Sequence, residues 1–569
     1  MPHGGLRSTP LQGLLAASAW LGWARLAKRV FDFLAGALWA LWGLIPWSWK
    51  RQGARGALPE PWESCPELRV YRGGDGEAKL LTVHTQPYSF QVDLARLATE
   101  SAYFEALSRS RMQEASERQL DLSHVPSDTF RAILEWVFSR RFSLGEEDLL
   151  PAVQSASYLM LPGFLDRCWV ALSPLLSPQN CLSYLGFAEA VGCPELRALV
   201  SRYLSARLLE LAAPVTGRLD PQLREELAQL RFEGHPMLCA LRKENVSLAP
   251  GVPLESLRGL YRRPLPPEEG DWRCATRLPF QAEKWSFSTA QLLNYLFVMG
   301  GYREKRGPRS FTFRMAAFCY NPLTGTWRPT AAPNKRRCHF SSAVVGHHIY
   351  AVGGWFLDSL LAPDSSTRLY TAVERYDPWA DSWAFVSSLP MGDFSFAVSL
   401  SHDLPLCTAH GGCIYALGSI QRTGEKLLLC YDVAADTWQE LLLTLTRADA
   451  DLPGLYFLGG TEPLFVVGGN TQDNVVTSFC PSTRQWGSTR TLPKCSLAGQ
   501  GLALDGTLYM ASPDLCPSPD MEALLEVELG VPDCRLLPPP PFPLSYEAIF
   551  LLHFPPEALG EEETAPEEL

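Results

Sequence analysis

Cysteine and histidine are the residue types in this chain that could hold a metal ion or act as nucleophiles. The 569 residues include 15 cysteines and 10 histidines, and no two cysteines form a Cys-x-x-Cys pair. Cys407 and Cys413 flank His410, but these three ligands have no fourth at a recognised spacing, so a metal site is the minor alternative. Cys338 beside His339 could be a reactive thiol, although a buried free cysteine is the favoured interpretation. We therefore expect no metal and no cofactor.

Other common catalytic signatures are missing from the sequence. It contains no phosphate-binding glycine loop and no nucleophile elbow around a serine. The net charge of −11 argues against nucleic acid as the main partner, because nucleic-acid binding relies on basic surfaces. The scattered cysteines favour a reducing, cytoplasmic compartment. The sequence predicts a protein that binds other proteins rather than an enzyme.

One pattern repeats four times between residues 296 and 486. An apolar strand ends in glycine, an aromatic turn follows, and a tryptophan comes next, at intervals near the ~50 residues of some propeller blades. The glycines would let the backbone turn sharply, and the aromatic rings would fill the space between blades. The glycines are Gly300, Gly301, Gly353, Gly354, Gly418, Gly468 and Gly469, and the aromatic residues are Tyr320, Trp327, Tyr376, Trp383, Tyr431, Trp438 and Trp486.

This pattern resembles the kelch repeat. The resemblance implies an all-β kelch propeller over 296–554 that binds a protein substrate through its loops. With weaker strands on either side, it predicts five or six blades, five being favoured, and a possible ring-closing strand in the linker 266–295. The long loops 302–314, 355–369 and 421–426 are the expected binding loops. The basic run Lys335–Arg336–Arg337 either meets an acidic partner or is a solvated connection.

A mixed α/β pattern precedes the propeller. Short strands are expected at 80–83, 88–92 and 119–122, and a helix over 127–138 begins at Ser127 as its cap. The segments 90–98, 101–104, 120–122 and 129–138, in this order, resemble a BTB domain. The helical pattern after Leu176 resembles a BACK domain. The resemblance implies an α/β BTB domain over 68–176 and an α-helical BACK domain over 177–265.

The resemblance also implies a function. Many BTB domains of this family dock a cullin-3 scaffold through a short hydrophobic-x-Glu motif, and Met112, Gln113 and Glu114 stand at the matching place. The chain would then be the substrate-recognition subunit of a ubiquitin ligase. The alternative is a scaffold without a ligase that binds cytoskeletal or membrane-associated proteins. The family's BTB domains also form homodimers, but the helix that usually completes the dimer is replaced here by a Pro-rich linker.

Residues 1–50 differ from the rest of the chain. Two apolar runs, 11–24 and 33–49, are rich in tryptophan and are separated by Arg25, Lys28 and Arg29. The second run approaches the length needed to span a bilayer, and Lys50 and Arg51 follow it. Membrane anchoring through 11–49 is favoured over a helix that covers the protein itself. A signal peptide is disfavoured, because basic residues occupy the place of its cleavage site. A linker at 51–67 and a disordered acidic tail at 555–569 complete the predicted organisation.

Overall fold

The structure is a computed structural model, and the part of the chain that it describes lies between Arg69 and Pro555. Within this range the description leaves out 73–79, 110–112, 212–214, 216, 243–258, 266–270, 281–283, 286, 305–310, 314–315, 339, 357–367, 370, 391–393, 396–405, 421–425, 443–454, 461–462, 470–473, 493–497, 513–522, 529–533, 539 and 541–546. The apolar segment 11–49, the linker 51–67 and the acidic tail after Pro555 are outside the described residues. Among the helices that are described, none is long and apolar enough to cross a membrane.

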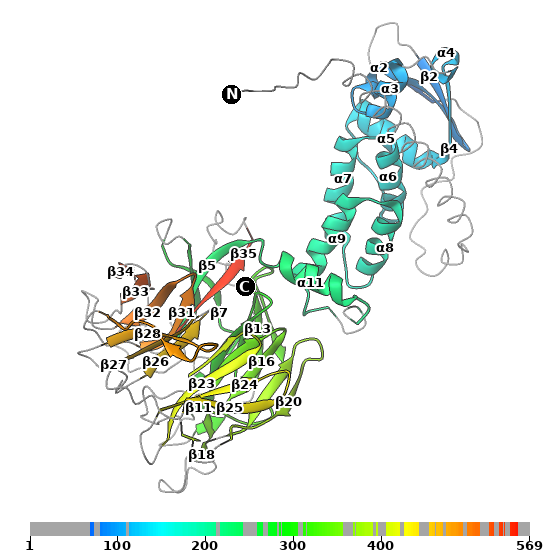
Figure 1. Ribbon diagram of the computed structural model, residues 1–569. Helices are drawn as coiled ribbons and strands as arrows, with labels where there is room; N and C mark the ends of the chain where they lie inside the picture. Colours follow the sequence, from blue (N-terminus) through cyan, green and yellow to red (C-terminus); the bar gives the residue numbers. More distant parts are fainter. Residues whose placement is uncertain are drawn as a thin grey trace, which may run out of the picture.

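An α/β domain forms the N-terminal end of the described chain (Figure 1). Its sheet has the order β1 (Arg69–Tyr71), β3 (Ser89–Asp93), β2 (Leu80–Gln86) and β4 (Gln119–Pro126). Buried and less buried residues alternate along β2, as expected for a strand with one face on a core. The helices that accompany the sheet are α2 (Leu94–Ala98), α3 (Ala102–Arg109), α4 (Gln113–Glu117) and α5 (Ser127–Ser139).

A helical arm connects this domain to the propeller (Figure 1). Local sequence sets the ends of its helices. Gly192 ends α8 in a left-handed conformation that suits glycine, and the Asp220 carboxylate caps α11 by accepting from the N–H groups of Gln222 and Leu223 at 2.8 and 3.0 Å. The arm consists of α6 (Glu146–Tyr158), α7 (Pro162–Leu172), the short η2 (Ser173–Leu175), α8 (Cys181–Val191), α9 (Pro194–Ala206) and α11 (Pro221–Leu230).

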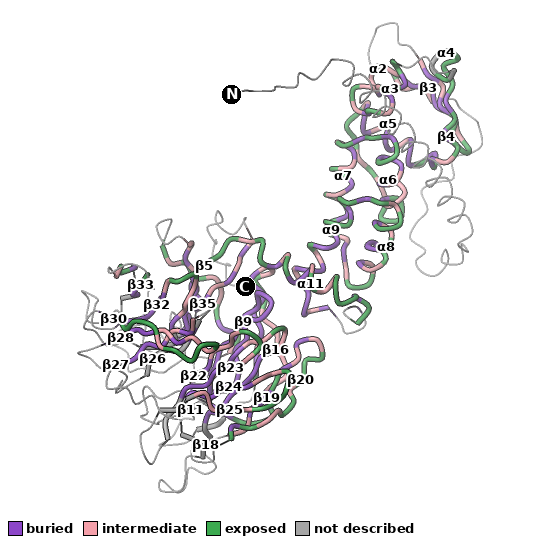
Figure 2. Tube along the Cα trace, in the orientation of Figure 1, coloured by how far each residue is buried: buried purple, intermediate pink, exposed green. Residues whose placement is uncertain are grey.

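Six antiparallel blades form the propeller, and their innermost strands lie next to one another around the ring. In the first two blades burial is greater in the second strand from the inside than in the outermost strand (Figure 2). From the inside outward, the first blade is β9 (Ser288–Leu292), β10 (Tyr295–Met299), β13 (Ala317–Asn321) and β14 (Thr326–Thr330); the second is β15 (Ser341–Val345), β16 (His348–Val352), β19 (Val373–Asp377) and β20 (Ser382–Val386); the third is β22 (Leu406–His410), β23 (Cys413–Ile420), β24 (Lys426–Asp432) and β25 (Thr437–Leu442), with β21 (Phe394–Ser395) also on β23.

The remaining blades follow the same plan. The fourth is β26 (Leu455–Gly460), β27 (Leu464–Gly469) and β28 (Asn474–Cys480) with the short outer strands β29 (Gln485–Trp486) and β30 (Arg490–Thr491); the fifth is β31 (Ala498–Leu504), β32 (Thr507–Ser512), β33 (Ala523–Glu528) and β34 (Cys534–Leu537); the sixth is β35 (Glu547–Phe554), β5 (His235–Arg242), β6 (Gly259–Pro264) and β7 (Arg273–Arg277). Three short strands, β8 (Lys284–Trp285), β11 (Tyr302–Glu304) and β12 (Phe311–Phe313), form a separate sheet, and β17 (Trp355–Phe356) pairs with β18 (Arg368–Leu369).

The sixth blade corrects two expectations. Six blades, not the favoured five, close the ring, because β35 pairs along its whole length with β5. Strands β5 and β6 also fall inside 177–265, which was predicted to be helical throughout, and the described helices end with α11 at Leu230. The linker 266–295 contributes β7 to the sixth blade and β9 to the first. The closing strands therefore come from both ends of the propeller's stretch of chain.

Candidate interaction surfaces

The predicted cullin-docking motif lies at the start of α4. Met112 is outside the described residues, Gln113 is the first residue of α4, and Glu114 is exposed in the first turn of the helix. An exposed carboxylate can accept hydrogen bonds from a partner without breaking an internal pair. The structure thus leaves Glu114 available to a partner.

An aromatic surface patch lies close to Glu114, and we define it by Tyr103, His124, Tyr158 and Met160. The ring centroids of Tyr103 and Tyr158 are 5.6 Å apart, and those of His124 and Tyr158 are 4.7 Å apart. Tyr158 is 48% exposed and Met160 is 57% exposed. Large apolar side chains that gather on a surface mark interaction sites. This patch could not be predicted from the sequence, because an apolar pattern does not show which of its residues face solvent.

Burial and nearby charge perturb Tyr103 in this patch. Burial, followed by interactions with Tyr158 and then the negative charge of Glu114, raises the pKa of Tyr103 to about 12. The contribution of Glu114 indicates that its carboxylate lies near the patch. Ser101 holds the two helices of the patch together: its hydroxyl donates to the Leu159 carbonyl at 2.5 Å and accepts from the N–H of Phe104 at 3.2 Å. The patch is therefore fixed by buried contacts beneath it.

The predicted propeller glycines have two different roles. Gly300, Gly301, Gly353 and Gly354 have φ values of 66°, 88°, 68° and 87°, which glycine adopts readily and other residues rarely do. A Cβ on Gly300 would lie 2.6 Å from the carbonyl oxygen of Arg337. The first two glycine pairs therefore allow a close approach between blades. The other glycines, in contrast, lie within paired strands: Gly418 in β23, and Gly468 and Gly469 in β27.

The predicted Tyr and Trp residues stand opposite each other in neighbouring strands. The pairs Tyr320–Trp327, Tyr376–Trp383 and Tyr431–Trp438 have ring centroids 5.1, 5.1 and 4.9 Å apart. In the fourth blade Phe479 takes the place of tyrosine and packs on Trp486 at 5.0 Å. These stacked pairs repeat in the first four blades.

The indole groups of the second and third blades link each of these blades to the residue that follows the preceding one. Trp383 donates to the Ala331 carbonyl at 2.9 Å, and Trp438 donates to the Ser387 carbonyl at 2.8 Å. An aspartate adds a second link: Asp436 accepts from the Tyr431 hydroxyl at 2.6 Å and from the Ser387 N–H at 2.9 Å. These two hydrogen bonds, the tyrosine first, lower the pKa of Asp436. The repeat residues thus fasten adjacent blades.

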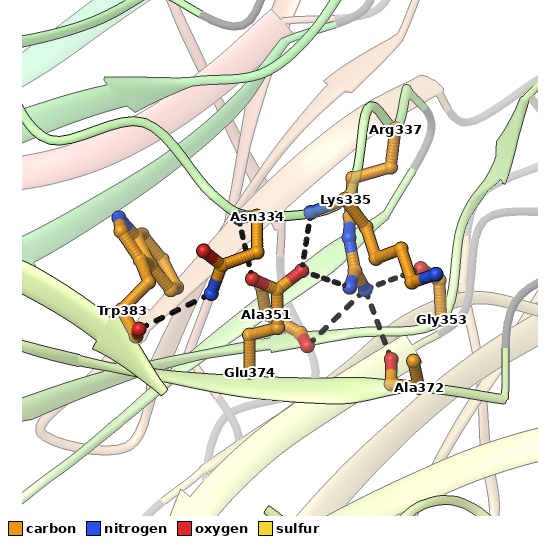
Figure 3. A network of polar contacts seen from close by, with 8 residues as sticks. All are labelled: Asn334, Lys335, Arg337, Ala351, Gly353, Ala372, Glu374 and Trp383. Atoms are coloured by element: carbon orange, nitrogen blue, oxygen red, sulfur yellow. Dashed lines mark hydrogen bonds and ion pairs between the residues drawn. The ribbon is translucent and has the colours of Figure 1, made fainter. Parts of the chain in front are cut away.

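A buried ion pair ties the connection between the first two blades to the second blade (Figure 3). Arg337 donates to the Glu374 carboxylate, and both side chains are fully buried. Glu374 also accepts from the N–H groups of Asn334 and Lys335 at 2.6 and 3.0 Å. The guanidinium group further donates to the Gly353 and Ala372 carbonyls at 2.8 and 3.0 Å. The prediction that Lys335, Arg336 and Arg337 together meet an acidic partner or solvent is therefore wrong for Arg337. This residue is buried, whereas Lys335 and Arg336 are exposed.

Arg231 forms the centre of the junction between the arm and the propeller. It directly follows α11 and is 0% exposed. It donates to the Ser205 carbonyl at the end of α9, to the Leu293 and Asn294 carbonyls at 2.6 and 3.2 Å, and to Asn321 Oδ1 at 2.9 Å. Burial is the main cause that lowers the pKa of this guanidinium group. One side chain thus contacts both parts of the molecule.

Glu210 provides a negative charge near Arg231. Its carboxylate accepts from the Tyr295 hydroxyl at 2.9 Å and from Asn321 Nδ2 at 2.7 Å. The Tyr295 oxygen in turn accepts from the N–H of Leu209 at 3.1 Å, and the Tyr295 ring lies 3.7 Å from the Arg231 guanidinium carbon. Tyr295 and Asn321 therefore connect the Glu210 carboxylate to the Arg231 cation. A buried positive charge needs a nearby negative charge and hydrogen-bond partners to offset the cost of removing it from water.

The junction determines which end of the propeller remains open. The β9–β10 turn and the β13–β14 turn, at Asn294 and Asn321, contact the arm. Because strands alternate in direction, the connections that follow β10, β16 and β23 emerge at the opposite end. The predicted binding loops 302–314, 355–369 and 421–426 are these connections. All three therefore start from the end of the propeller that faces away from the arm.

The cysteine–histidine set considered in the sequence is part of the third blade. Cys407 and His410 lie in β22, and His410 pairs with Cys413 across the turn to β23. Burial raises the pKa of Cys407 to about 12, so this thiol stays protonated. Over the described ranges, no group of three or more His, Cys, Asp or Glu residues is arranged to hold a metal ion.

An α/β domain with an exposed aromatic patch, a helical arm and a six-bladed propeller define a modular protein-interaction protein. Comparison with known families agrees: a BTB/POZ domain model matches residues 81–174, and a Kelch motif model matches residues 336–390. Kelch repeat and BTB domain-containing protein 13 of Homo sapiens is 31% identical over 451 residues, which cover 77% of this chain and 86% of that protein. The chain belongs to the BTB–kelch family.

Two further relatives are similar to smaller shares of the chain. Kelch-like protein 21 of Rattus norvegicus is 24% identical over 496 residues, covering 74% of this chain and 79% of the relative. Kelch domain-containing protein 7A of Mus musculus is 30% identical over 272 residues, covering 47% of this chain and 30% of the relative. The resemblance of residues 177–265 to a BACK domain stays a prediction, and it applies to the helices that end at Leu230.

Proposed function

We propose that the chain is the substrate-recognition subunit of a cullin-3 RING ubiquitin ligase. The BTB domain docks the cullin, the propeller binds a protein substrate, and the chain itself performs no catalytic step. It acts by raising the local concentration of the substrate near the ligase. The observation that carries the proposal is the exposed Glu114 on the same domain as the aromatic patch, where its charge acts on Tyr103.

The composition of the BTB surface supports docking. Tyr158 and Met160 provide exposed apolar area, and Glu114 provides a carboxylate beside it. Interfaces of this kind gain most of their affinity from a few central apolar residues, with polar groups around them fixing the orientation. Met112 belongs to the motif by sequence.

The open end of the propeller supports substrate binding there. The arm occupies the turns at Asn294 and Asn321, whereas the long connections emerge at the other end. Lys335 and Arg336 are exposed in the β14–β15 connection at this end. We therefore propose that the substrate contacts the end that faces away from the arm and carries acidic residues for these two cations.

Recovery of cullin-3 by the full chain tests the docking half of the proposal. We expect the wild-type chain to bind, and Glu114→Ala and Tyr158→Ala each to weaken binding by more than about tenfold. Glu117→Ala is the matched control, because Glu117 is also exposed on α4 but lies at its other end. Absence of cullin binding by the wild-type chain would refute the ligase assignment and leave the scaffold without a ligase as the function.

A further inference from the structure

We propose that Arg231 is a positioning residue that fixes the direction of the helical arm relative to the propeller. Without it, the arm would be hinged. The inference does not depend on cullin docking, because it concerns the geometry of the chain alone. It would hold for a ligase subunit and for a scaffold alike.

The acceptors of Arg231 explain why this position requires an arginine. The Ser205 carbonyl belongs to the arm, and the Leu293 and Asn294 carbonyls belong to the first blade. The planar guanidinium group offers five N–H donors in a fixed arrangement and reaches both sides at once. A lysine has three N–H donors on a single nitrogen, fewer than the four hydrogen bonds that the Arg231 side chain makes. An apolar residue would leave several buried carbonyl groups without a donor.

Asn294 extends the attachment to the blade that closes the ring. Its side-chain nitrogen donates to the Arg231 carbonyl at 2.9 Å and to the His553 carbonyl at 2.8 Å. Its side-chain oxygen accepts from the N–H of His553 at 2.8 Å. Arg231 is thus hydrogen-bonded to the first blade, and Asn294 links it to β35 of the sixth blade. A displacement of the arm would have to break bonds to both blades.

Helix α11 also contacts the second blade. In α11, Glu225 lies 3.2 Å from His347, and the Arg224 guanidinium lies 5.4 Å from the centre of the Trp379 ring. His347 and Trp379 belong to the turns of the second blade. These partly exposed contacts contribute little energy by themselves. Their role is geometric, because attachment at a second point prevents rotation about the first.

The distance between the BTB domain and the propeller, measured on single molecules of the full chain, tests the inference. Fluorescent amino acids replace the exposed Glu117 on α4 and the exposed Arg484 in the fourth blade. We expect the wild-type chain to give one narrow distribution of transfer efficiency. Arg231→Met and Arg231→Lys should both lose this narrow peak and give a broad distribution. Circular dichroism checks that the helices and the blades remain folded.

The matched control is Arg197→Met. Arg197 lies in the same arm and pairs with Glu226 at 2.9 Å, but the pair is about half exposed, so this variant should keep the narrow peak. If Arg231→Met fails to fold, Arg231→Lys decides, because it keeps the positive charge but has three donors for four acceptors. A broadened peak in Arg231→Lys then supports the inference. A narrow peak in Arg231→Met, or in Arg231→Lys when the first variant does not fold, would overturn it.

Discussion

The buried pair of Arg337 and Glu374 permits a quantitative test of how adjacent blades are held together. Glu374→Gln keeps the size and shape of the side chain but removes its negative charge. Arg337 would then be a fully buried cation with a neutral amide in place of its carboxylate partner. Loss of one member of a buried pair destabilises proteins by about 3–5 kcal/mol. Because total stabilities are about 5–15 kcal/mol, the loss would be a large part of the whole.

Denaturant unfolding of the full chain, followed by tryptophan fluorescence, measures this loss. Trp383 lies near the pair, since its carbonyl accepts from the side chain of Asn334 at 3.1 Å, so it is one of the tryptophans whose emission changes when these blades unfold. The control is Glu226→Gln, which breaks a half-exposed pair and should change stability by about 1 kcal/mol or less. The double variant Arg337→Met/Glu374→Gln should lose less stability than the two single variants added together. Equal shifts for Glu374→Gln and Glu226→Gln would refute the reasoning.

Three further predictions concern glycine, pH and the membrane. Gly300→Ala should destabilise the propeller by about 3 kcal/mol or more, and Gly325→Ala by only about 1 kcal/mol. Both glycines have positive φ, but of the two only Gly300 lacks room for a Cβ. Unfolding midpoints of the two variants measure the difference, and equal losses of stability would contradict this reasoning. The hydrogen bonds to Asp436 lower its pKa below 3.8, so their stabilisation is complete above this pH and is lost as the pH falls below it. Wild-type protein should therefore lose more stability than Asp436→Asn as the pH falls below 3.8, and parallel pH profiles would argue against this role. If residues 11–49 anchor the chain, full-length protein should resist carbonate extraction from membranes and a chain without residues 1–50 should be released, whereas release of both would exclude anchoring.

The propeller could be predicted from sequence only where its repeats are complete. Stacked pairs such as Tyr376 and Trp383 leave a pattern that is visible without a structure, because the same contact needs the same residues in each blade. The sixth blade has no such pattern. Its strands β5 and β35 are far apart in sequence and pair with each other in the folded propeller. This pairing depends on the closed ring, which no local signal describes.

Side-chain partners account for the other differences between prediction and structure. Ser127 was expected to cap its helix, but its hydroxyl lies 2.8 Å from that of Thr85 and accepts from the N–H of Tyr88 at 3.2 Å, so it ties α5 to the sheet instead. Arg337 appeared to belong to a charged surface run and instead pairs with Glu374 inside the propeller. In both positions the residue type was read correctly as polar. Its partner came from another part of the chain, and so local sequence could not identify it.

The way the ring closes also determines the order in which this protein can be made. Chains fold from their N-terminal domains onward as they leave the ribosome, so the BTB domain and the helices can form early. Strands β5 to β7 emerge next, yet they must wait for β35, whose last residue is Phe554. During that interval the inner edge of β5 is exposed, and exposed strand edges favour wrong pairing and aggregation. Translation that stops before residue 547 would leave this edge open permanently, so quality control during synthesis should remove such shortened chains.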